Sequence, residues 1–198
     1  IRRKKCQFIF MKYLLKIRNS LVEISESILI GLLFFMALNL TLQNYVVRGD
    51  SMIPKYVSDQ RVLVLKFSYI ENILPKDIVN NNSYYLEPFD PRRGDIVVFK
   101  YPSNVKRKFV KRIIGLPGDN ISIRNGFVFV NNIKIKEPYL ESDKYRGYDN
   151  FGPVTVDPNH IFVLGDNRRV SNDSRNWGQV NYDFVIGKPF IKYWPLVD

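Results

Sequence analysis

The sequence predicts a mostly β protein, with an antiparallel-sheet domain that follows one N-terminal transmembrane helix. Residues 27–47 form a stretch of 21 residues without a charged side chain, which as a helix would span roughly 30 Å. After residue 48 the chain consists of short runs rich in Val, Ile, Phe and Tyr, separated by Gly, Pro, Asn and Asp. No amphipathic helical pattern follows, so we expect a single β domain in this 198-residue chain.

A basic head precedes the apolar segment. Residues 1–18 contain seven Lys or Arg and no acidic residue, so we assign residues 1–27 to a cytoplasmic head and residues 28–47 to a transmembrane anchor. By the positive-inside rule, residues 48–198 form an extracytoplasmic domain. A signal-peptide core or a buried helix has a similar composition, but no small-x-small cleavage pattern follows the apolar run.

Seven β-type runs are predicted in the body of the chain. The sequence Asn125-Gly126 between two of them predicts a two-residue hairpin turn. Residues 70–93 and 137–158 are predicted to be surface loops. The predicted strands are 61–67, 95–100, 109–114, 120–124, 127–130, 160–164 and 185–193.

Cysteine and histidine are too scarce to build several kinds of site. Cys6 is the only cysteine and His160 the only histidine, which excludes an intrachain disulfide and thiolate or histidine metal cages. We expect no metal and no cofactor. The body carries 23 basic and 17 acidic residues, a modest excess compared with the net charge of +11 for the whole chain. Membrane lipids are the expected partner of this surface rather than nucleic acid.

Ser51 lies between Gly49 and Pro54, directly after the apolar segment. Glycine permits backbone angles closed to other residues and proline stiffens the exit from a turn, so the hydroxyl can be presented on a shaped turn. The same residues occur in plain turns, and a nucleophilic serine needs a base within hydrogen-bond reach. Ser51 is therefore a candidate nucleophile only if a base can be found.

Lys111 is a better candidate for this base than His160, which lies in a turn without other marks of a catalytic triad. Strand alternation places Phe109, Lys111 and Ile113 on one face, where a lysine among apolar side chains loses hydration and its pKa falls. Either Lys111 or Arg112 must point inward. Arginine cannot accept the proton because it stays protonated.

The polar segment 165–178 lies between two apolar strands. It fits a surface loop, but its two acids and two of its three arginines are also able to hold one another in place. Ser171 or Ser174 is able to orient an amine. The charged residues concerned are Asp166, Arg168, Asp173 and Arg175.

Four segments in this order resemble the type I signal peptidases. Residues 51–54 are similar to the nucleophile box of this family, residues 93–99 to its structural strand, residues 110–119 to its general-base box and residues 165–178 to its final box. The small body resembles the Gram-positive form. The resemblance implies a mostly β fold, related to that of self-cleaving repressor proteases, with a long antiparallel sheet and a membrane-proximal active site.

The resemblance also implies roles for single residues. Ser51 attacks the scissile carbonyl and Lys111 is the general base. Ser171 orients the lysine, and Asp173 with Arg175 forms a supporting ion pair. Shallow pockets accept small side chains, mostly alanine, one and three residues before the cut; the residues implied in lining them are Val47, Met52 and Val110.

Two positions depart from the pattern of the family. The backbone N–H of Ser51 is the implied oxyanion donor, but Gly49 offers no hydroxyl as a second donor. Lys55 stands where the family usually has threonine. The expected substrates are precursors with signal peptides, and the expected location is a bacterial plasma membrane, with an organellar membrane and the oligomeric state left open.

Two other interpretations compete. A self-cleaving repressor protease shares the Ser/Lys chemistry, but it needs a DNA-binding helical domain that does not fit the basic head and apolar span. A non-catalytic anchored β domain would keep Ser51 and Lys111 beyond hydrogen-bond reach. The separation of these two side chains therefore distinguishes an enzyme from a binding module.

Overall fold

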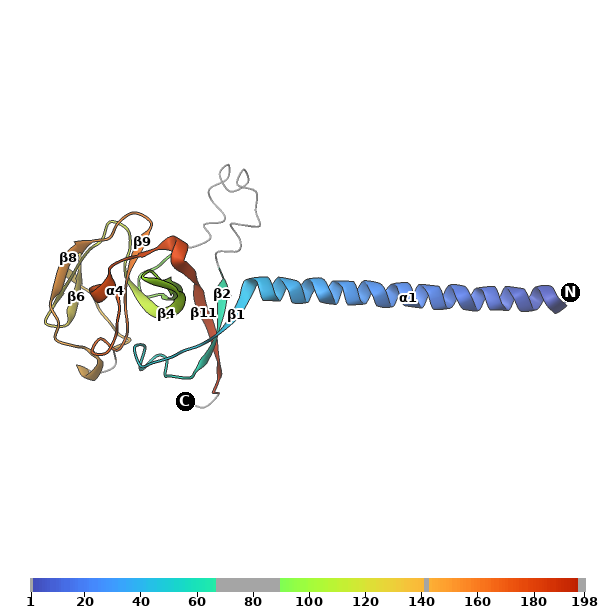
Figure 1. Ribbon diagram of the computed structural model, residues 1–198, viewed down its shortest axis with the longest axis horizontal. Coiled ribbons are helices and arrows are strands. Elements are labelled where there is room, and N and C mark those ends of the chain that lie inside the picture. The colour runs from blue at the N-terminus through green and yellow to red at the C-terminus, as the bar shows by residue number, and fades with distance from the viewer. Residues whose placement is uncertain (1, 67–89, 141–142, 196–198) are drawn as a thin grey trace. The chain divides into compact units, whose positions relative to one another are not determined.

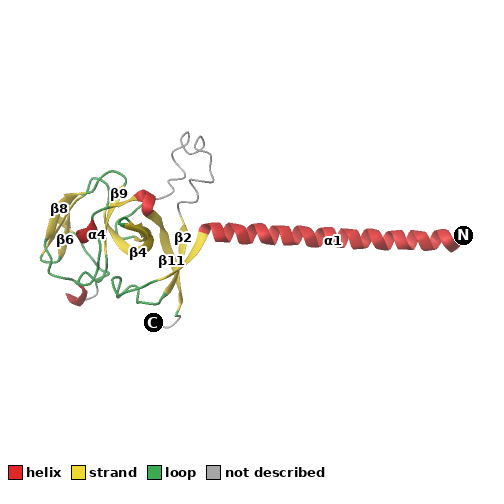
Figure 2. Ribbon diagram, viewed as in Figure 1, coloured by secondary structure: helices red, strands yellow, loops and turns green. Residues whose placement is uncertain are grey.

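The computed structural model describes residues 2–66, 90–140 and 143–195. The chain divides into two compact units, residues 1–40 and residues 41–198 (Figure 1). The first unit is almost entirely the helix α1, which runs from Arg2 to Thr41. The second is built from strands, as Figure 2 shows in yellow, so the predicted mostly β fold with one N-terminal helix is confirmed.

Within α1, residues Lys16–Thr41 are long and apolar enough to cross a membrane, with a mean hydropathy of 2.1. Their large side chains are exposed; Phe34 is 66% and Phe35 65% accessible. The helix ends at Thr41, so the predicted anchor, residues 28–47, is wrong at its end. Leu42–Val46 form strand β1 because each of these residues pairs with β2, Arg61–Lys66.

The larger sheet has seven strands in the order β1-β2-β11-β3-β4-β9-β10. All of its neighbouring pairs are antiparallel. The long strand β4 lies inside this sheet and carries the candidate base. The remaining strands are β3 (Ile96–Tyr101), β4 (Asn104–Gly115), β9 (His160–Leu164), β10 (Val180–Asn181) and β11 (Val185–Trp194).

A second antiparallel sheet has the order β7-β6-β5-β8. The predicted hairpin is confirmed: β5 and β6 are joined by Asn125 and Gly126, whose φ angles of 48° and 77° are those of a type I′ turn. The bounds are β5 (Asn120–Arg124), β6 (Phe127–Val130), β7 (Ile133–Lys134) and β8 (Phe151–Thr155). Short helical turns lie at Asp143–Tyr145 (η1), Ser174–Trp177 (α4) and Tyr182–Phe184 (η2).

All seven predicted strands are present, and three of them, β5, β6 and β9, have the predicted bounds. The predicted surface loop at residues 137–158 is wrong in part, because it contains strand β8 and the buried residues Glu137, Leu140 and Val156. The other predicted loop, residues 70–93, falls mostly on residues 67–89, which lie outside the described residues.

Apolar packing fixes the segment around Ser51. Met52 is fully buried in a cluster with Val47, Tyr56 and Val62, against which Val110 of β4 also packs. Strands β1, β2 and β4 therefore share one core with the residue that follows the candidate nucleophile. Ser51 therefore directly precedes a residue that is packed in the same cluster as Val110 of β4.

Candidate active site

Ser51 lies in a turn that follows β1. The turn is possible because Gly49 adopts a φ of +84°, a backbone conformation that favours glycine. Tyr56 N–H donates to the Met52 carbonyl at 2.8 Å and closes the turn, while Asn167 N–H donates to the Ser51 carbonyl at 3.0 Å. The polar segment 165–178 thus holds the backbone of the candidate nucleophile.

Lys111 meets Ser51 directly. Its Nζ donates a hydrogen bond to Ser51 Oγ at 2.6 Å, although the two residues are far apart in the sequence. The lysine is only 4% exposed, and its Nζ lies 5.4 Å from the centre of the Phe109 ring. The pairing of β3 with β4 sets this position, since Val97 opposes Lys111 in the register.

Burial lowers the pKa of Lys111 from about 10.5 to about 8. The carboxylates of Asp173 and Asp166 oppose this change, and the guanidinium of Arg175 adds to it. Within the described part of the chain, no carboxylate lies within ion-pair distance of Lys111 Nζ. An appreciable fraction of the side chain is therefore a neutral amine near neutral pH, and this amine is able to accept a proton.

Ser171 lies beside the pair but does not make the bond that the resemblance implies. Its Oγ is buried and has no hydrogen-bond partner among the described residues. Ser171 packs closely against Gly165, because a Cβ at Gly165 would overlap both Ser171 Oγ and the Ser51 carbonyl oxygen. Glycine at this position lets the segment 165–178 approach the candidate nucleophile.

Asp173 and Arg175 form the expected ion pair. The guanidinium contacts the carboxylate through Nε at 2.8 Å and through Nη2 at 2.9 Å, and its Nη1 lies 2.5 Å from Asp149. Asp173 is fully buried; it caps α4 and accepts from Gly165 N–H at 3.0 Å. The pair therefore holds the segment on which Ser171 lies.

Arg112 is buried as well, so the expectation that only one of Lys111 and Arg112 points inward is wrong. Strand β4 lies inside the sheet at this point and both of its faces are covered. The Arg112 guanidinium donates to both carboxylate oxygens of Asp166, at 2.8 and 2.6 Å, and to the Gly94 carbonyl at 2.7 Å. Although burial opposes its charge, the Asp166 carboxylate raises the pKa of Arg112.

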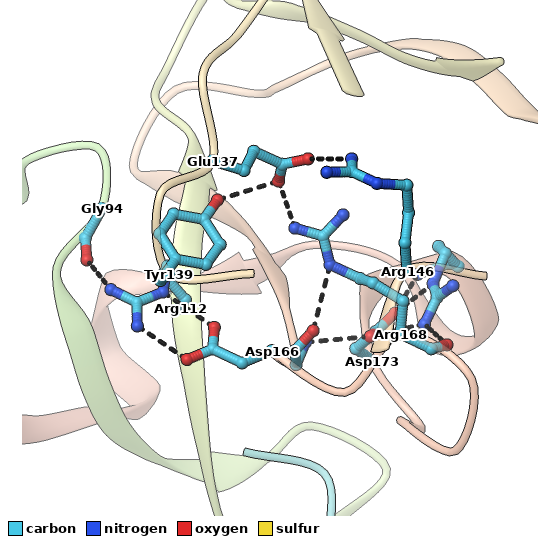
Figure 3. A network of polar contacts seen from close by, with 10 residues as sticks. Gly94, Arg112, Glu137, Tyr139, Arg146, Asp166, Arg168 and Asp173 are labelled. Atoms are coloured by element: carbon cyan, nitrogen blue, oxygen red, sulfur yellow. Dashed lines mark hydrogen bonds and ion pairs between the residues drawn. The ribbon is translucent and has the colours of Figure 1, made fainter. Parts of the chain in front are cut away.

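A wider network joins this arginine to the segment between β7 and β8, through the ring of Tyr139. Figure 3 shows Glu137 between the guanidinium groups of Arg146 and Arg168, with the hydroxyl of Tyr139 pointing toward its carboxylate. Burial raises the pKa of Tyr139, and the charge of Glu137 raises it further. The predicted mutual pairing of the acids and arginines of segment 165–178 is therefore wrong for Asp166 and Arg168, whose partners are Arg112 and Glu137.

A cleft of about 610 Å³ opens beside Ser51 and Lys111. Residues 45–51 form one wall and residues 106–111 the other, so Val47 and Val110 line it as expected. Met52 does not line it, because its side chain is fully buried in the core. Lys55 is exposed and lies outside the lining.

The Ser51 backbone N–H donates to no protein acceptor in the described part of the chain. It is thus available to an oxyanion, as the resemblance implies. The Gly49 N–H instead donates to Ser58 Oγ at 3.3 Å. His160 lies at the start of β9, where its Nδ1 is 2.8 Å from the Pro158 carbonyl oxygen. His160 does not line the cleft. The residue that lies beside Ser51 there is Lys111.

Comparison with known proteins adds independent information. The sequence profile of signal peptidase, peptidase S26, matches residues 21–194. The chain belongs to this signal peptidase family. It is therefore a hydrolase of the serine peptidase class. The matched region takes in both Ser51 and Lys111.

Relatives in this family are similar over most of their length. Signal peptidase I of Bacillus caldolyticus is 41% identical over 164 residues, which cover 77% of this chain and 80% of the relative. Signal peptidase I S of Bacillus subtilis (strain 168) is 39% identical and covers 80% of each chain. A solved structure, a signal peptidase I from Enterococcus faecalis V583, is 32% identical, with a TM-score of 0.46; it covers 52% of this chain and 98% of its own.

Two residues of the site were missed by sequence reasoning. Gly165 follows a buried strand, and a glycine there is typical of a close backbone approach, so its role was open to prediction. Glu137 gives no such signal, because a single acid beside Lys136 and Pro138 reads as an exposed loop residue. Its burial depends on arginines that follow much later in the sequence.

Proposed function

We propose that this signal peptidase family member is a membrane-bound endopeptidase that removes N-terminal signal peptides from secreted precursors by means of a Ser51/Lys111 dyad. The observation that carries the proposal is the 2.6 Å contact between Lys111 Nζ and Ser51 Oγ, in a site that lowers the pKa of the lysine to about 8. A nucleophile and a base in contact are what acyl transfer by serine requires.

The chemistry follows from this geometry. Neutral Lys111 accepts the Ser51 proton as Oγ attacks the scissile carbonyl, and the Ser51 backbone N–H stabilises the oxyanion that forms. When the C–N bond breaks, the Lys111 ammonium returns a proton to the leaving amine. Lys111 then takes a proton from water as the water oxygen attacks the acyl-serine ester. When the ester bond breaks, the Lys111 ammonium returns this proton to Ser51 Oγ, and the signal peptide leaves with a new carboxylate.

A free sheet edge supports binding of an extended substrate. Residues Lys108–Lys111 of β4 pair with β3 on one side, while pairing with β9 begins only at Arg112. Their other edge has no partner strand among the described residues, and it borders the cleft. A peptide added as a strand here satisfies its own backbone and places alternate side chains against Val47 and Val110. The valines leave room for small residues, which fits Ala-x-Ala sites.

The membrane part of the proposal rests on α1. Its apolar portion, Lys16–Thr41, suits a bilayer span, and the basic residues before it favour a cytoplasmic N-terminus. The catalytic domain then lies on the extracytoplasmic side, where signal peptides present their cleavage sites. We propose lipid head groups, and no nucleic acid, as partners of the basic surface of this domain.

An inactive anchored β domain is the alternative from another class. It would have no need to bury a lysine without a carboxylate partner, because an unpaired buried cation costs stability. The Ser51–Lys111 contact therefore favours an enzyme over an inactive domain.

The test is cleavage of a precursor with an Ala-x-Ala site by the purified full chain in detergent, with the products identified by mass. We expect cleavage after the second alanine, and its loss in Ser51→Ala and Lys111→Ala. Lys134→Ala, at an exposed lysine of β7, is the matched control and should keep its activity. Cleavage that survived either dyad substitution would contradict the mechanism.

A further inference from the structure

Three adjacent basic residues, Lys106, Arg107 and Lys108, line the end of the cleft away from Ser51. All three are exposed, and none forms an ion pair with an acid in the described part of the chain. Among the described residues, two of them contact rings instead: Arg107 lies 5.4 Å from the centre of Phe109, and Lys108 lies 5.0 Å from that of Tyr45. We call residues 106–108 the basic rim.

The basic rim lies on the free edge of β4. Val47 and Val110 come before Ser51 and Lys111 in their respective walls, on the side of the dyad toward the rim. If these valines hold the small residues before the cut, as in the proposed function on which this inference rests, the signal peptide runs from the dyad toward the rim. The mature part of the precursor leaves in the other direction.

The position of the rim in β4 sets the substrate residue that it faces. Lys108 and Lys106 precede Lys111 by three and five residues in the same strand. A peptide added to the edge rises by the same ~3.3 Å per residue as the regular part of β4, Lys108–Lys111, and reaches the irregular residues 105–107 beyond it. With the residue before the cut beside Lys111, the rim faces substrate residues roughly four to six positions before the cut.

We propose that the basic rim is a specificity element that selects signal peptides with an acidic or uncharged residue roughly four to six positions before the cut, and rejects those with Lys or Arg there. Opposite charges attract across the cleft and like charges repel. Asp50, the acidic residue among those that line the cleft, lies beside Ser51 at the other end. It does not neutralise the rim.

Anionic lipid is a rival ligand for exposed basic residues. The site favours a peptide, because the three residues belong to the same wall as Lys111 and their strand has a free edge beside them. A lipid surface needs neither a cleft nor a free edge.

The test uses the full chain in non-ionic detergent and three peptides with one Ala-x-Ala site, which carry Glu, Gln or Lys five positions before the cut. We expect kcat/KM to fall in that order, with at least about fivefold between Glu and Lys at low salt, and the ratio to approach one at about 0.5 M salt. The difference should lie in KM, since the interaction is the same in substrate and transition state.

Two variants separate the rim from net charge. Lys106→Gln/Arg107→Gln/Lys108→Gln should cleave all three peptides equally, whereas Lys134→Gln/Lys136→Gln/Lys144→Gln removes as many charges from exposed sites outside the cleft and should keep the preference. A preference that persists in the rim variant, or vanishes equally in the control, overturns the proposal. So does a rim variant that loses only its binding to phosphatidylglycerol vesicles, because the rim would then recognise lipid.

Binding of the same peptides to Ser51→Ala, measured by fluorescence anisotropy, keeps this inference distinct from the proposed function. The same order of affinities is expected without catalysis. Ordered binding without any cleavage by the unmodified chain would contradict the proposed function and support the rim. Cleavage together with equal binding of the three peptides would support the proposed function and contradict the role of the rim.

Discussion

Lys111 and Arg112 are neighbours on β4, both are buried, and the structure treats their charges in opposite ways. Arg112 faces a carboxylate that takes two of its hydrogen bonds, a backbone carbonyl that takes a third, and the ring of Tyr139 at 4.0 Å. Lys111 faces a hydroxyl and the ring of Phe109. One side of the strand compensates a cation, and the other side leaves it uncompensated.

The difference shows how one strand provides both support and catalysis. A buried cation without a carboxylate is stabilised by losing its proton, and lysine is able to do so. Arginine is not, and it therefore needs Asp166. Exchange of the two environments would leave Lys111 locked in an ion pair, unable to act as a base.

The largest effect is expected for Lys111→Met, which keeps the volume of the side chain and removes the amine. Activity should fall roughly 10³-fold or more, because no other base among the residues with described positions contacts Ser51. The free energy of unfolding at pH 7 should stay equal or rise by up to about 3 kcal/mol, the cost that corresponds to a pKa of about 8 against about 10.5. Peptide cleavage and urea denaturation measure the two quantities.

The sign of this stability effect depends on pH. The unfolded chain binds the Lys111 proton more tightly than the folded chain, so the stability of the unmodified protein rises as the pH increases from about 8 to about 10.5. The advantage of methionine should shrink over this window. A Lys111→Met protein that is clearly less stable at pH 7 would contradict the idea of an uncompensated cation.

The second largest effect is expected for Arg112→Met. This change leaves the fully buried Asp166 carboxylate without its partner and should lower the free energy of unfolding by about 3–5 kcal/mol. The double variant Arg112→Met/Asp166→Leu should recover part of this loss in urea denaturation. If the double variant is no more stable than the single one, the ion pair is not what Arg112 contributes.

The pH dependence of activity should follow Lys111. The neutral amine is the active form, so kcat/KM should rise roughly tenfold per pH unit well below pH 8 and level off above it. The measurement is a profile of kcat/KM between pH 6 and pH 10 with an uncharged peptide. An inflection near pH 10.5 would mean that the site does not lower the pKa.

The smallest effect is expected for Tyr139→Phe, which removes the 2.9 Å hydrogen bond to Glu137 and keeps the ring on Arg112. The free energy of unfolding should fall by about 1–2 kcal/mol, with little change in kcat/KM. Tyr148→Phe, at a tyrosine that is 81% exposed, is the matched control and should change neither. An equal loss of activity and stability in Tyr139→Phe would place the network in the catalytic machinery.

The sequence predicts well where the local pattern and the tertiary environment agree. Alternating or continuous β-branched runs define the buried strands. Asn125-Gly126 defines its hairpin through local turn preference, without contacts from distant parts of the chain. Ser51 and Lys111 are predictable only because a nucleophilic serine needs a base and because four segments of the chain resemble one family. Neither residue is distinctive within its own segment.

Predictions failed where long-range contacts decide. Gln43 and Asn44 followed an apolar run and were assigned to the anchor, but their pairing with β2 makes them a strand. In β8, Gly152 and Pro153 read as a loop, although β5 pairs with the residues around them. Burial of both faces of β4, and with it the Arg112–Asp166 pair, depends on β9 and the second sheet.

The free edge of β4 has a consequence for solubility. An unpaired strand edge is a template on which a second copy of the chain can add its own edge, the first step toward aggregation. Here an addition centred on Arg107 would bring Lys106, Arg107 and Lys108 of two molecules side by side, and their like charges would repel. The residues that we propose to sort substrates would thereby also keep the edge open, so that it stays free for a peptide with the opposite charge.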